Sequence, residues 1–255
     1  MKSICYNICK KTEGAGIMKT KGVLFDKDGT LIDFDSFWTE IAVHAVDYLL
    51  TNLHINPSLR GGALYAIGVR ENGTDVDGVL CKGTYGDIAE VLQAYFLKKG
   101  VEIPLQSVYE ATVNGFHKHA DKGKIVPTCE NIRGVLSDLK EKGLKLGVMT
   151  SDDAHITKTC LKGLQIEDLF DVIYTDDGTH PNKPDPFCIR AFCETFGLSK
   201  DEVVMVGDSL TDITFAHNGD IKAVAVAKTK ENVDFLTGKA AIVVPDISYL
   251  KDVLV

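Results

Sequence analysis

The chain has no long hydrophobic run, and this limits the classes of protein to which it can belong. None of its apolar stretches approaches the roughly 20 residues that a membrane-spanning helix needs, so we expect no membrane partner. The first 20 residues contain Lys2, Lys10 and Lys11 but no continuous apolar segment, and they do not resemble a secretory signal. We interpret residues 1–19 as an N-terminal extension, disordered or otherwise. Both Met1 and Met18 stay open as the start of the natural chain.

Cysteine pairs at metal-binding spacing and an excess of positive charge are also lacking. The seven cysteines are scattered and none falls in a Cys-x-x-Cys pair, which argues against a zinc site and fits a reduced, cytoplasmic setting. The net charge of −8 argues against nucleic acid or an anionic membrane surface as the main partner. It also disfavours an anionic substrate, unless local positive charge or a metal offsets it at the site.

What is present is the composition of a globular protein, with 45% hydrophobic and 25% charged residues in 255. After residue 125, short apolar segments alternate with stretches of helical periodicity, which predicts parallel strands joined by right-handed helical crossovers. The expected strands lie at residues 144–149, 171–174, 203–206, 223–226 and 241–244. Residues 22–25 are apolar throughout, as expected of a central strand. The sequence therefore predicts the α/β class, with a doubly wound parallel sheet.

Residues 34–125 have a different pattern, because helical periodicity dominates and comparable buried strands are lacking. A stretch rich in Gly, Asp and Thr, from Gly68 to Tyr85, reads as a long loop. We expect a smaller all-helical domain over 34–125. It would be inserted into a core formed by residues 20–33 and 126–255.

The strand of residues 22–25 leads directly into Asp26-Lys27-Asp28-Gly29-Thr30-Leu31. Two carboxylates two residues apart at a strand end point the same way, and a glycine lets the backbone turn away at once. Such a pair can hold a divalent cation and place one carboxylate as a nucleophile beside an acid/base. An EF-hand is excluded, because the glycine is at the fourth loop position rather than the sixth.

Three more polar segments follow three other expected strands. Thr150-Ser151-Asp152 follows the second strand of the core, and Gly207-Asp208-Ser209-Leu210-Thr211-Asp212 follows the fourth. Lys183, after the third strand, is expected to open a helix. Ligands of open parallel sheets bind outside the carboxyl ends of the strands, so these segments should converge at one edge. Each segment alone is a weak signal, but the four together are a strong one.

The residue types fit phosphoryl transfer. Asp26 can attack phosphorus, while Asp28 protonates the leaving oxygen and later deprotonates the attacking water. A Mg²⁺ ion held by Asp26, Asp208 and a backbone carbonyl near Asp28, with Asp212 in support, would offset the repulsion between carboxylate and phosphate.

The phosphate itself needs hydrogen-bond donors. The Thr150 hydroxyl, the backbone N–H groups after it and the Lys183 ammonium can hold the non-bridging oxygens. Gly29, Ser151 and Asp152 are therefore further candidate substrate-binding positions.

These motifs resemble those of the haloacid dehalogenase-like hydrolase superfamily, and specifically its Mg²⁺-dependent phosphatases in the phosphoglycolate phosphatase-like branch. The matching positions are residues 26–31, Thr150, Lys183 and residues 207–212, and the resemblance covers about residues 20–255. It implies a Rossmann-like core with a helical cap inserted after the first motif. It also implies hydrolysis of a small phosphorylated metabolite through an aspartyl phosphate.

Several alternatives can be weighed against this interpretation. A phosphomutase of the β-phosphoglucomutase type would keep all four motifs, so it stays open. A non-catalytic phosphate-binding module should lack the nucleophile or the acid/base, and neither is missing. True dehalogenases of this superfamily lack the second aspartate, so Asp28 argues against halide chemistry. A receiver-type signalling domain has neither that aspartate nor the insertion.

The substrate should be selected by the inserted domain, because the core motifs contact only phosphate and metal. Candidate contacts on or beside its polar loop are Arg70, Lys82, Thr84 and Tyr85, although a solvated loop is an equal alternative. Two positive side chains would suit a second anion, as in phosphoglycolate or a sugar phosphate. The histidines are expected to be structural, since Mg²⁺ prefers oxygen ligands. The oligomeric state is left open.

Overall fold

The computed structural model describes residues 18–71, 73–75 and 78–254, which form two compact units. The first unit joins the segment that ends at Asp33 to the segment that begins at Pro127, and the second spans Phe34–Val126. Most of the predicted N-terminal extension, residues 1–17, lies outside the described residues. The predicted insertion, 34–125, differs from the second unit by one residue at its end.

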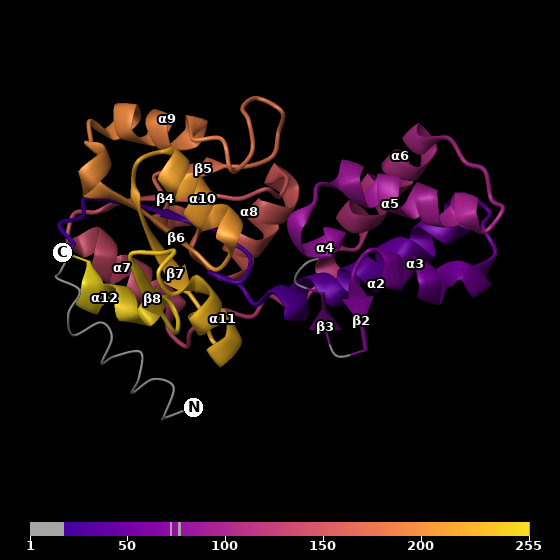
Figure 1. Ribbon diagram of the computed structural model, residues 1–255, viewed down its shortest axis with the longest axis horizontal. Helices are drawn as coiled ribbons and strands as arrows, with labels where there is room; N and C mark the ends of the chain where they lie inside the picture. Colours follow the sequence, from indigo (N-terminus) through magenta and orange to yellow (C-terminus); the bar gives the residue numbers. More distant parts are fainter. Residues whose placement is uncertain (1–17, 72, 76–77, 255) are drawn as a thin grey trace. The chain divides into compact units, whose positions relative to one another are not determined.

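The first unit contains a six-stranded sheet in the order β5-β4-β1-β6-β7-β8, and every neighbouring pair is parallel. Figure 1 shows these strands side by side with helices on either side. The strands are β1 (Gly22–Phe25), β4 (Lys145–Met149), β5 (Val172–Tyr174), β6 (Val203–Gly207), β7 (Lys222–Val226) and β8 (Ile242–Val244). The predicted fold class is confirmed.

Strand β1 lies at the middle of the sheet because its side chains are apolar on both faces. Val23 and Phe25 pack in one core cluster and Leu24 packs in another, and all three are fully buried. The first cluster includes residues of α7, α8 and α12, and the second includes residues of α9, α10 and α11. The helices are α7 (Ile132–Glu141), α8 (Ala154–Gly163), α9 (Phe187–Phe196), α10 (Leu210–Asn218), α11 (Lys230–Leu236) and α12 (Leu250–Val253). Short 3-10 helices cover Glu167–Leu169, Lys200–Glu202 and Ile247–Tyr249.

The boundary predicted for the N-terminal extension is wrong at its last residues. Met18 is buried, its N–H donates to the Val253 carbonyl over 3.0 Å, and it forms a bridge with Leu254. The chain therefore enters the core before residue 20. The apolar thioether of Met18 packs with the C-terminal residues, a long-range contact that local composition does not reveal.

The second unit is helical apart from one short hairpin. Its elements are α2 (Phe34–Asn52), a 3-10 turn (Pro57–Leu59), α3 (Arg60–Ala66), β2 (Val69–Arg70), β3 (Gly73–Thr74), α4 (Val79–Lys82), α5 (Tyr85–Lys98), α6 (Leu105–Lys118) and a 3-10 turn (Ala120–Lys122). The loop predicted from Gly68 to Tyr85 thus contains an antiparallel hairpin and a short helix. Gly68 and Gly73 have positive φ angles of 104° and 127°, and such glycine-dependent turns leave no trace in the apolar periodicity.

Two expectations about the chain's chemistry can be compared with the described residues. Among the helices that the structure describes, none is long and apolar enough to cross a membrane. The five cysteines in the described ranges are free thiols, and Cys160, Cys188 and Cys193 are buried. These three therefore act as small core residues.

Candidate active site

The carboxyl ends of the central strands bring the first, second and fourth motifs together within the first unit. Strand β1 lies between β4 and β6, so Asp26, Thr150 and Asp208 follow three neighbouring strands. Asp26 continues the ladder through its N–H, which donates to the Val206 carbonyl over 2.8 Å. The parallel order of the sheet therefore produces the convergence that the sequence predicts.

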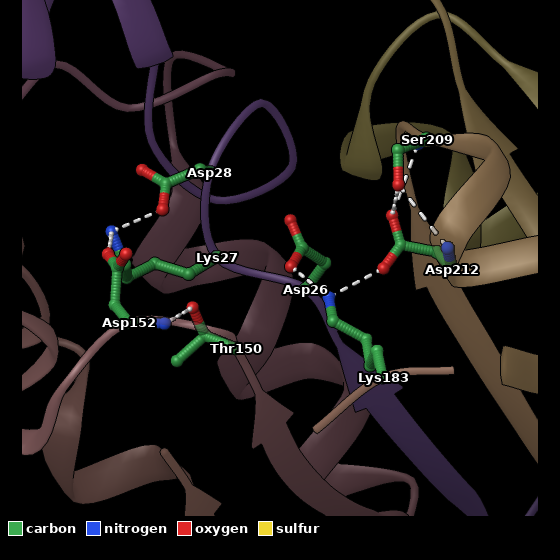
Figure 2. Close-up of polar contacts among 8 residues, drawn as sticks. All are labelled: Asp26, Lys27, Asp28, Thr150, Asp152, Lys183, Ser209 and Asp212. Carbon is green, nitrogen blue, oxygen red and sulfur yellow. Dashed lines mark hydrogen bonds and ion pairs between the residues drawn. The ribbon is translucent and has the colours of Figure 1, made fainter. Parts of the chain in front are cut away.

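Asp26, Lys183 and Asp212 form a buried ionic cluster (Figure 2). The Nζ atom of Lys183 lies 2.6 Å from Oδ1 of Asp26 and 2.7 Å from Oδ1 of Asp212, and its side chain is only 5% exposed. Asp208 joins them, because carboxylate oxygens of Asp26, Asp208 and Asp212 lie within 4.8 Å of one another. Three carboxylates thus lie together, and the Lys183 ammonium group contacts two of them, Asp26 and Asp212.

Burial, together with the neighbouring carboxylates, raises the pKa of two of these groups, Asp26 and Asp208. Burial, opposed by Lys183 and reinforced by Asp212 and Asp28, raises the pKa of Asp26 to about 7. Burial and the charges of Asp26 and Asp212 also raise the pKa of Asp208 well above its ordinary value. For Lys183, burial opposes the charged form, but the two carboxylates outweigh it and the pKa is raised.

The donor set fits a hard divalent cation. Three carboxylate groups crowded beside one ammonium carry more negative charge than Lys183 alone balances, and oxygen ligands of this kind suit Mg²⁺. The carboxylates expected to hold the ion, Asp26, Asp208 and Asp212, are thus brought together by the fold. The Asp28 side chain is not part of this group, and a contribution of this region to the metal site through its backbone carbonyl stays a prediction.

A second ionic cluster lies beside the first and contains Lys27, Asp28 and Asp152 (Figure 2). The Nζ atom of Lys27 is 2.7 Å from Oδ2 of Asp28 and 2.7 Å from Oδ2 of Asp152, and the lysine side chain is fully buried. Burial favours the neutral amine, yet Asp152 and Asp28 more than compensate and the pKa of Lys27 is raised. Burial also raises the pKa of Asp152, against the charge of Lys27.

Lys27 is a member of the site that was not predicted from the sequence. The sequence could have indicated its role, because a lysine that directly follows an apolar central strand is expected to be buried and paired with a counterion. Asp152, expected to bind substrate through its position after Thr150, directs its carboxylate at Lys27, and its contact with a substrate stays a prediction.

The turns around the site explain the glycine and hydroxyl residues. Gly29 has a φ angle of 76°, and a Cβ atom there would lie 2.1 Å from Oδ2 of Asp208. Its N–H donates to the Ile32 carbonyl over 2.8 Å. The Thr150 hydroxyl is buried and accepts a hydrogen bond from the Asp152 N–H over 3.2 Å, and Ser151 lies between them in the same bend.

The fourth motif contains a helix cap that the sequence analysis did not use. The Ser209 hydroxyl accepts a hydrogen bond from the Asp212 N–H over 3.3 Å and donates one to Oδ2 of Asp212 over 2.6 Å. This capping box begins α10 and holds Asp212 in place for its contact with Lys183. The Ser-x-x-Asp spacing predicts it directly.

The expectation that Lys183 opens a helix is wrong. The residue lies in the connection between β5 and α9, and α9 begins only at Phe187. Pro184 follows Lys183 directly, and a residue before proline is disfavoured in helical conformation. The lysine reaches the site from a turn instead.

The candidate specificity residues belong to the second unit. Arg70 in β2 lies 2.7 Å from Asp75 and 4.0 Å from the centre of the Tyr65 ring. Lys82 is the last residue of α4, and Thr84 caps α5, which begins at Tyr85. Arg70 is thus engaged within its own hairpin, and contacts of these four residues with a substrate stay predictions.

Comparisons with known proteins agree with the motifs. A family model described as haloacid dehalogenase-like hydrolase matches residues 84–226, more than half of the chain. A putative pyrophosphatase PpaX from Caldanaerobacter subterraneus is 29% identical over 82% of this chain and 82% of its own length. Pyrophosphatase PpaX from Bacillus mycoides is 27% identical over 86% of this chain and 89% of its own length.

Solved structures share the fold. A predicted phosphoglycolate phosphatase from Haemophilus somnus is 20% identical, with a TM-score of 0.66 over 93% of this chain and 99% of that protein. A phosphatase from Thermococcus onnurineus is 24% identical, with a TM-score of 0.63 over 91% of this chain and 97% of its own. The family match, which spans more than half of the chain, shows that the chain belongs to the haloacid dehalogenase-like hydrolase family.

Proposed function

We propose that the protein is a Mg²⁺-dependent phosphatase that hydrolyses a small phosphorylated metabolite through an aspartyl phosphate at Asp26. The observation that carries this proposal is the cluster of Asp26, Asp208 and Asp212 around Lys183, at the end of the central strand. It combines a nucleophile, a cation site and a fixed positive charge. Asp28, two residues from the nucleophile, supplies the acid/base that a phosphatase needs.

In the first step the Asp26 carboxylate attacks phosphorus and the bond from phosphorus to the leaving oxygen breaks. Protonated Asp28 gives its proton to that oxygen, so an alcohol leaves and Asp28 becomes a carboxylate. Lys183 and the N–H groups that follow Thr150 hold the non-bridging oxygens. The Mg²⁺ ion, when bound, neutralises charge shared between the phosphate and the carboxylates.

In the second step water attacks phosphorus of the aspartyl phosphate. The Asp28 carboxylate takes a proton from this water, the acyl phosphate bond breaks, and Asp26 is regenerated as a carboxylate. Asp28 ends the cycle protonated, so it is ready for the next leaving group. One aspartate therefore serves both steps in opposite roles.

In this proposal the inserted unit recognises the leaving group. The chain leaves the core for this unit after Asp33, shortly after the first motif, and returns to the core at Pro127. We propose that this unit is a cap that excludes water in the first step and reads the leaving group, with Arg70 and Lys82 as candidate contacts.

Inorganic pyrophosphate is a second candidate substrate, favoured by the names of the relatives in Caldanaerobacter and Bacillus. Its leaving group is itself an anion, which would suit positive side chains on the inserted unit. The same catalytic steps would apply, with phosphate in place of an alcohol.

The test is a hydrolysis panel of phosphoglycolate, sugar phosphates, pyrophosphate and p-nitrophenyl phosphate, each with Mg²⁺ and with a chelator. We expect Mg²⁺-dependent release of phosphate from at least one natural ester or from pyrophosphate, and loss of that activity in Asp26→Asn. Full activity in the presence of the chelator, or in Asp26→Asn, would contradict the proposal.

A further inference from the structure

Lys27 is the buried charged group that the proposed mechanism leaves without a role. Its side chain is fully buried, and its ammonium group lies 2.7 Å from a carboxylate oxygen of Asp28 and 2.7 Å from one of Asp152 (Figure 2). A lysine with this burial must have paired charges around it, because an isolated buried ammonium is very costly. Two carboxylates provide that pairing, and one of them is the proposed acid/base.

Asp152, the member of this cluster that is not part of the first motif, is held by two hydrogen bonds of its main chain. The Asp152 N–H donates to the Thr150 hydroxyl over 3.2 Å, and the Asp152 carbonyl accepts from the Asp176 N–H over 2.8 Å. Asp152 is therefore fixed at its main chain, and its side chain holds the Lys27 ammonium. The lysine in turn holds Oδ2 of Asp28, so the Asp28 carboxylate is connected to a hydrogen-bonded bend at the end of β4.

The two buried ammonium groups of the site are divided between the two reacting carboxylates. Lys183 contacts Asp26 and Asp212, whereas Lys27 contacts Asp28 and Asp152. Figure 2 shows the two clusters on opposite sides of the chain that follows β1. Lys27 and Asp28 lie beyond the last residue of β1, so the expectation that Asp26 and Asp28 point the same way by strand alternation does not hold, and Asp28 pairs with Lys27.

We propose that Lys27, anchored by Asp152, is a positioning residue that fixes the Asp28 carboxyl group for proton transfer to the leaving oxygen. The inference rests on the proposed phosphatase function. Lys27 touches neither substrate nor phosphate in this role and acts only through Asp28. Proton transfer is sensitive to geometry, since donor and acceptor must come within hydrogen-bond distance. An Asp28 side chain released from Lys27 would sample other rotamers and protonate the leaving group less often.

The experiment compares leaving groups within one enzyme preparation. p-Nitrophenolate leaves readily as an anion and needs no proton, whereas the alcohol of an aliphatic phosphate ester does. The ratio of kcat/KM for the best aliphatic ester of the panel to kcat/KM for p-nitrophenyl phosphate therefore reports proton donation. This ratio does not depend on the fraction of folded enzyme, because both substrates meet the same molecules.

The variant to test is Lys27→Met combined with Asp152→Asn. Lys27→Met alone would leave the Asp152 carboxylate buried without its counterion, but the double change removes both charges together and conserves shape. We expect the ratio to fall by about tenfold or more, a part of the 10²–10⁴-fold that a positioned proton donor supplies. In an Asp28→Asn background the same two changes should alter the ratio no further, because Lys27 acts through Asp28.

A matched control removes an ion pair elsewhere in the same unit. Lys140 and Asp171 lie 2.6 Å apart, away from the four motifs, and Lys140→Met with Asp171→Asn should leave the ratio at the parental value. A parental ratio in the Lys27 and Asp152 double variant, with a lowered ratio in Asp28→Asn, would overturn the inference and leave the proposed function intact. An unchanged ratio in Asp28→Asn would instead overturn the acid/base assignment itself, and the inference with it.

Discussion

At the scale of single residues, Asp26 combines burial with a close positive charge and two further carboxylates. Its pKa is raised to about 7, chiefly by burial. The attacking species is the carboxylate, and a raised pKa means that acidification below about pH 7 protonates it. We therefore expect kcat/KM to fall as the pH drops through this value when Mg²⁺ is limiting.

A bound cation favours the ionised form of Asp26, so the inflection should move to lower pH as Mg²⁺ is raised. Profiles of kcat/KM against pH at low and saturating Mg²⁺ check this expectation. An inflection that stays in place, or that moves to higher pH with added Mg²⁺, would argue against contact between the ion and Asp26.

Gly29 gives a second prediction at this scale. Gly29→Ala would strain a φ angle of 76° and place a methyl carbon against the Asp208 carboxylate, so we expect weaker Mg²⁺ binding together with a loss of about 1–3 kcal/mol in the free energy of unfolding. Gly143 is the matched control, because its φ angle is 84° and a Cβ atom there would have no neighbour within 4 Å. Gly143→Ala should lose similar stability without a change in the Mg²⁺ requirement. Mg²⁺ titrations of activity measure the effect on metal binding, and chemical denaturation measures the effect on stability. Equal Mg²⁺ requirements in the two variants would contradict the assignment of Asp208 as a metal ligand.

Single residues also show how much of the candidate site could be predicted from the sequence. Asp26, Lys183 and Asp208 were predicted to converge because each follows a recognisable strand, and the order of a parallel sheet fixes where strand ends meet. The partners of Lys27 and Asp152 could not be predicted in the same way. An ion pair between residues so far apart in the sequence depends on the exact approach of two loops, which strand periodicity does not specify.

At the scale of elements, the start of α10 connects helix stability to the site. Ser209→Ala removes the cap and the hydroxyl that holds Asp212, so we expect a loss of about 1 kcal/mol in the free energy of unfolding and a lowered kcat. Thr229 caps α11 in the same way, with its hydroxyl accepting from the Asn232 N–H over 3.2 Å.

Thr229→Ala should therefore cost similar stability and leave kcat unchanged. Thermal or chemical denaturation with steady-state kinetics on both variants provides the measurement. Equal kcat in the two variants would show that the Ser209 hydroxyl is needed only to begin the helix.

The elements themselves were largely predictable, with informative exceptions. Buried strands such as β1 and β6 are apolar without interruption, and amphipathic helices such as α7 are followed by a glycine within two residues, so local sequence is sufficient for both. The hairpin of β2 and β3 has only two residues in each strand, too few to show an alternating pattern. Its turns depend on the conformation of glycine residues, and composition alone predicts a loop for such a glycine-rich segment.

At the scale of the whole molecule, the chain consists of two compact units that are joined by two crossings. The crossings begin and end beside each other in the core, because Ile32 forms a bridge with Pro127 and the Thr128 N–H donates to the Leu31 carbonyl over 3.1 Å. Residues 34–126 can therefore be replaced by a short glycine linker without stretching the core.

We expect this shortened chain to unfold cooperatively, since both core clusters consist of residues of the first unit alone. It should hydrolyse p-nitrophenyl phosphate slowly and distinguish poorly between natural substrates, because leaving-group recognition is assigned to the insertion. Circular dichroism and the substrate panel test both points. Undiminished substrate discrimination by the shortened chain would contradict the proposed role of the insertion.

The central claim is that phosphate passes through Asp26, and rapid acid quenching followed by peptide mass spectrometry tests it most directly. Enzyme mixed with its best substrate and Mg²⁺ should carry one phosphoryl group within the first turnover, on the peptide that contains Asp26. The group should be absent without Mg²⁺ and in Asp26→Asn. Turnover with no phosphoryl group on the enzyme at any time, or with the group on another residue, would contradict the account.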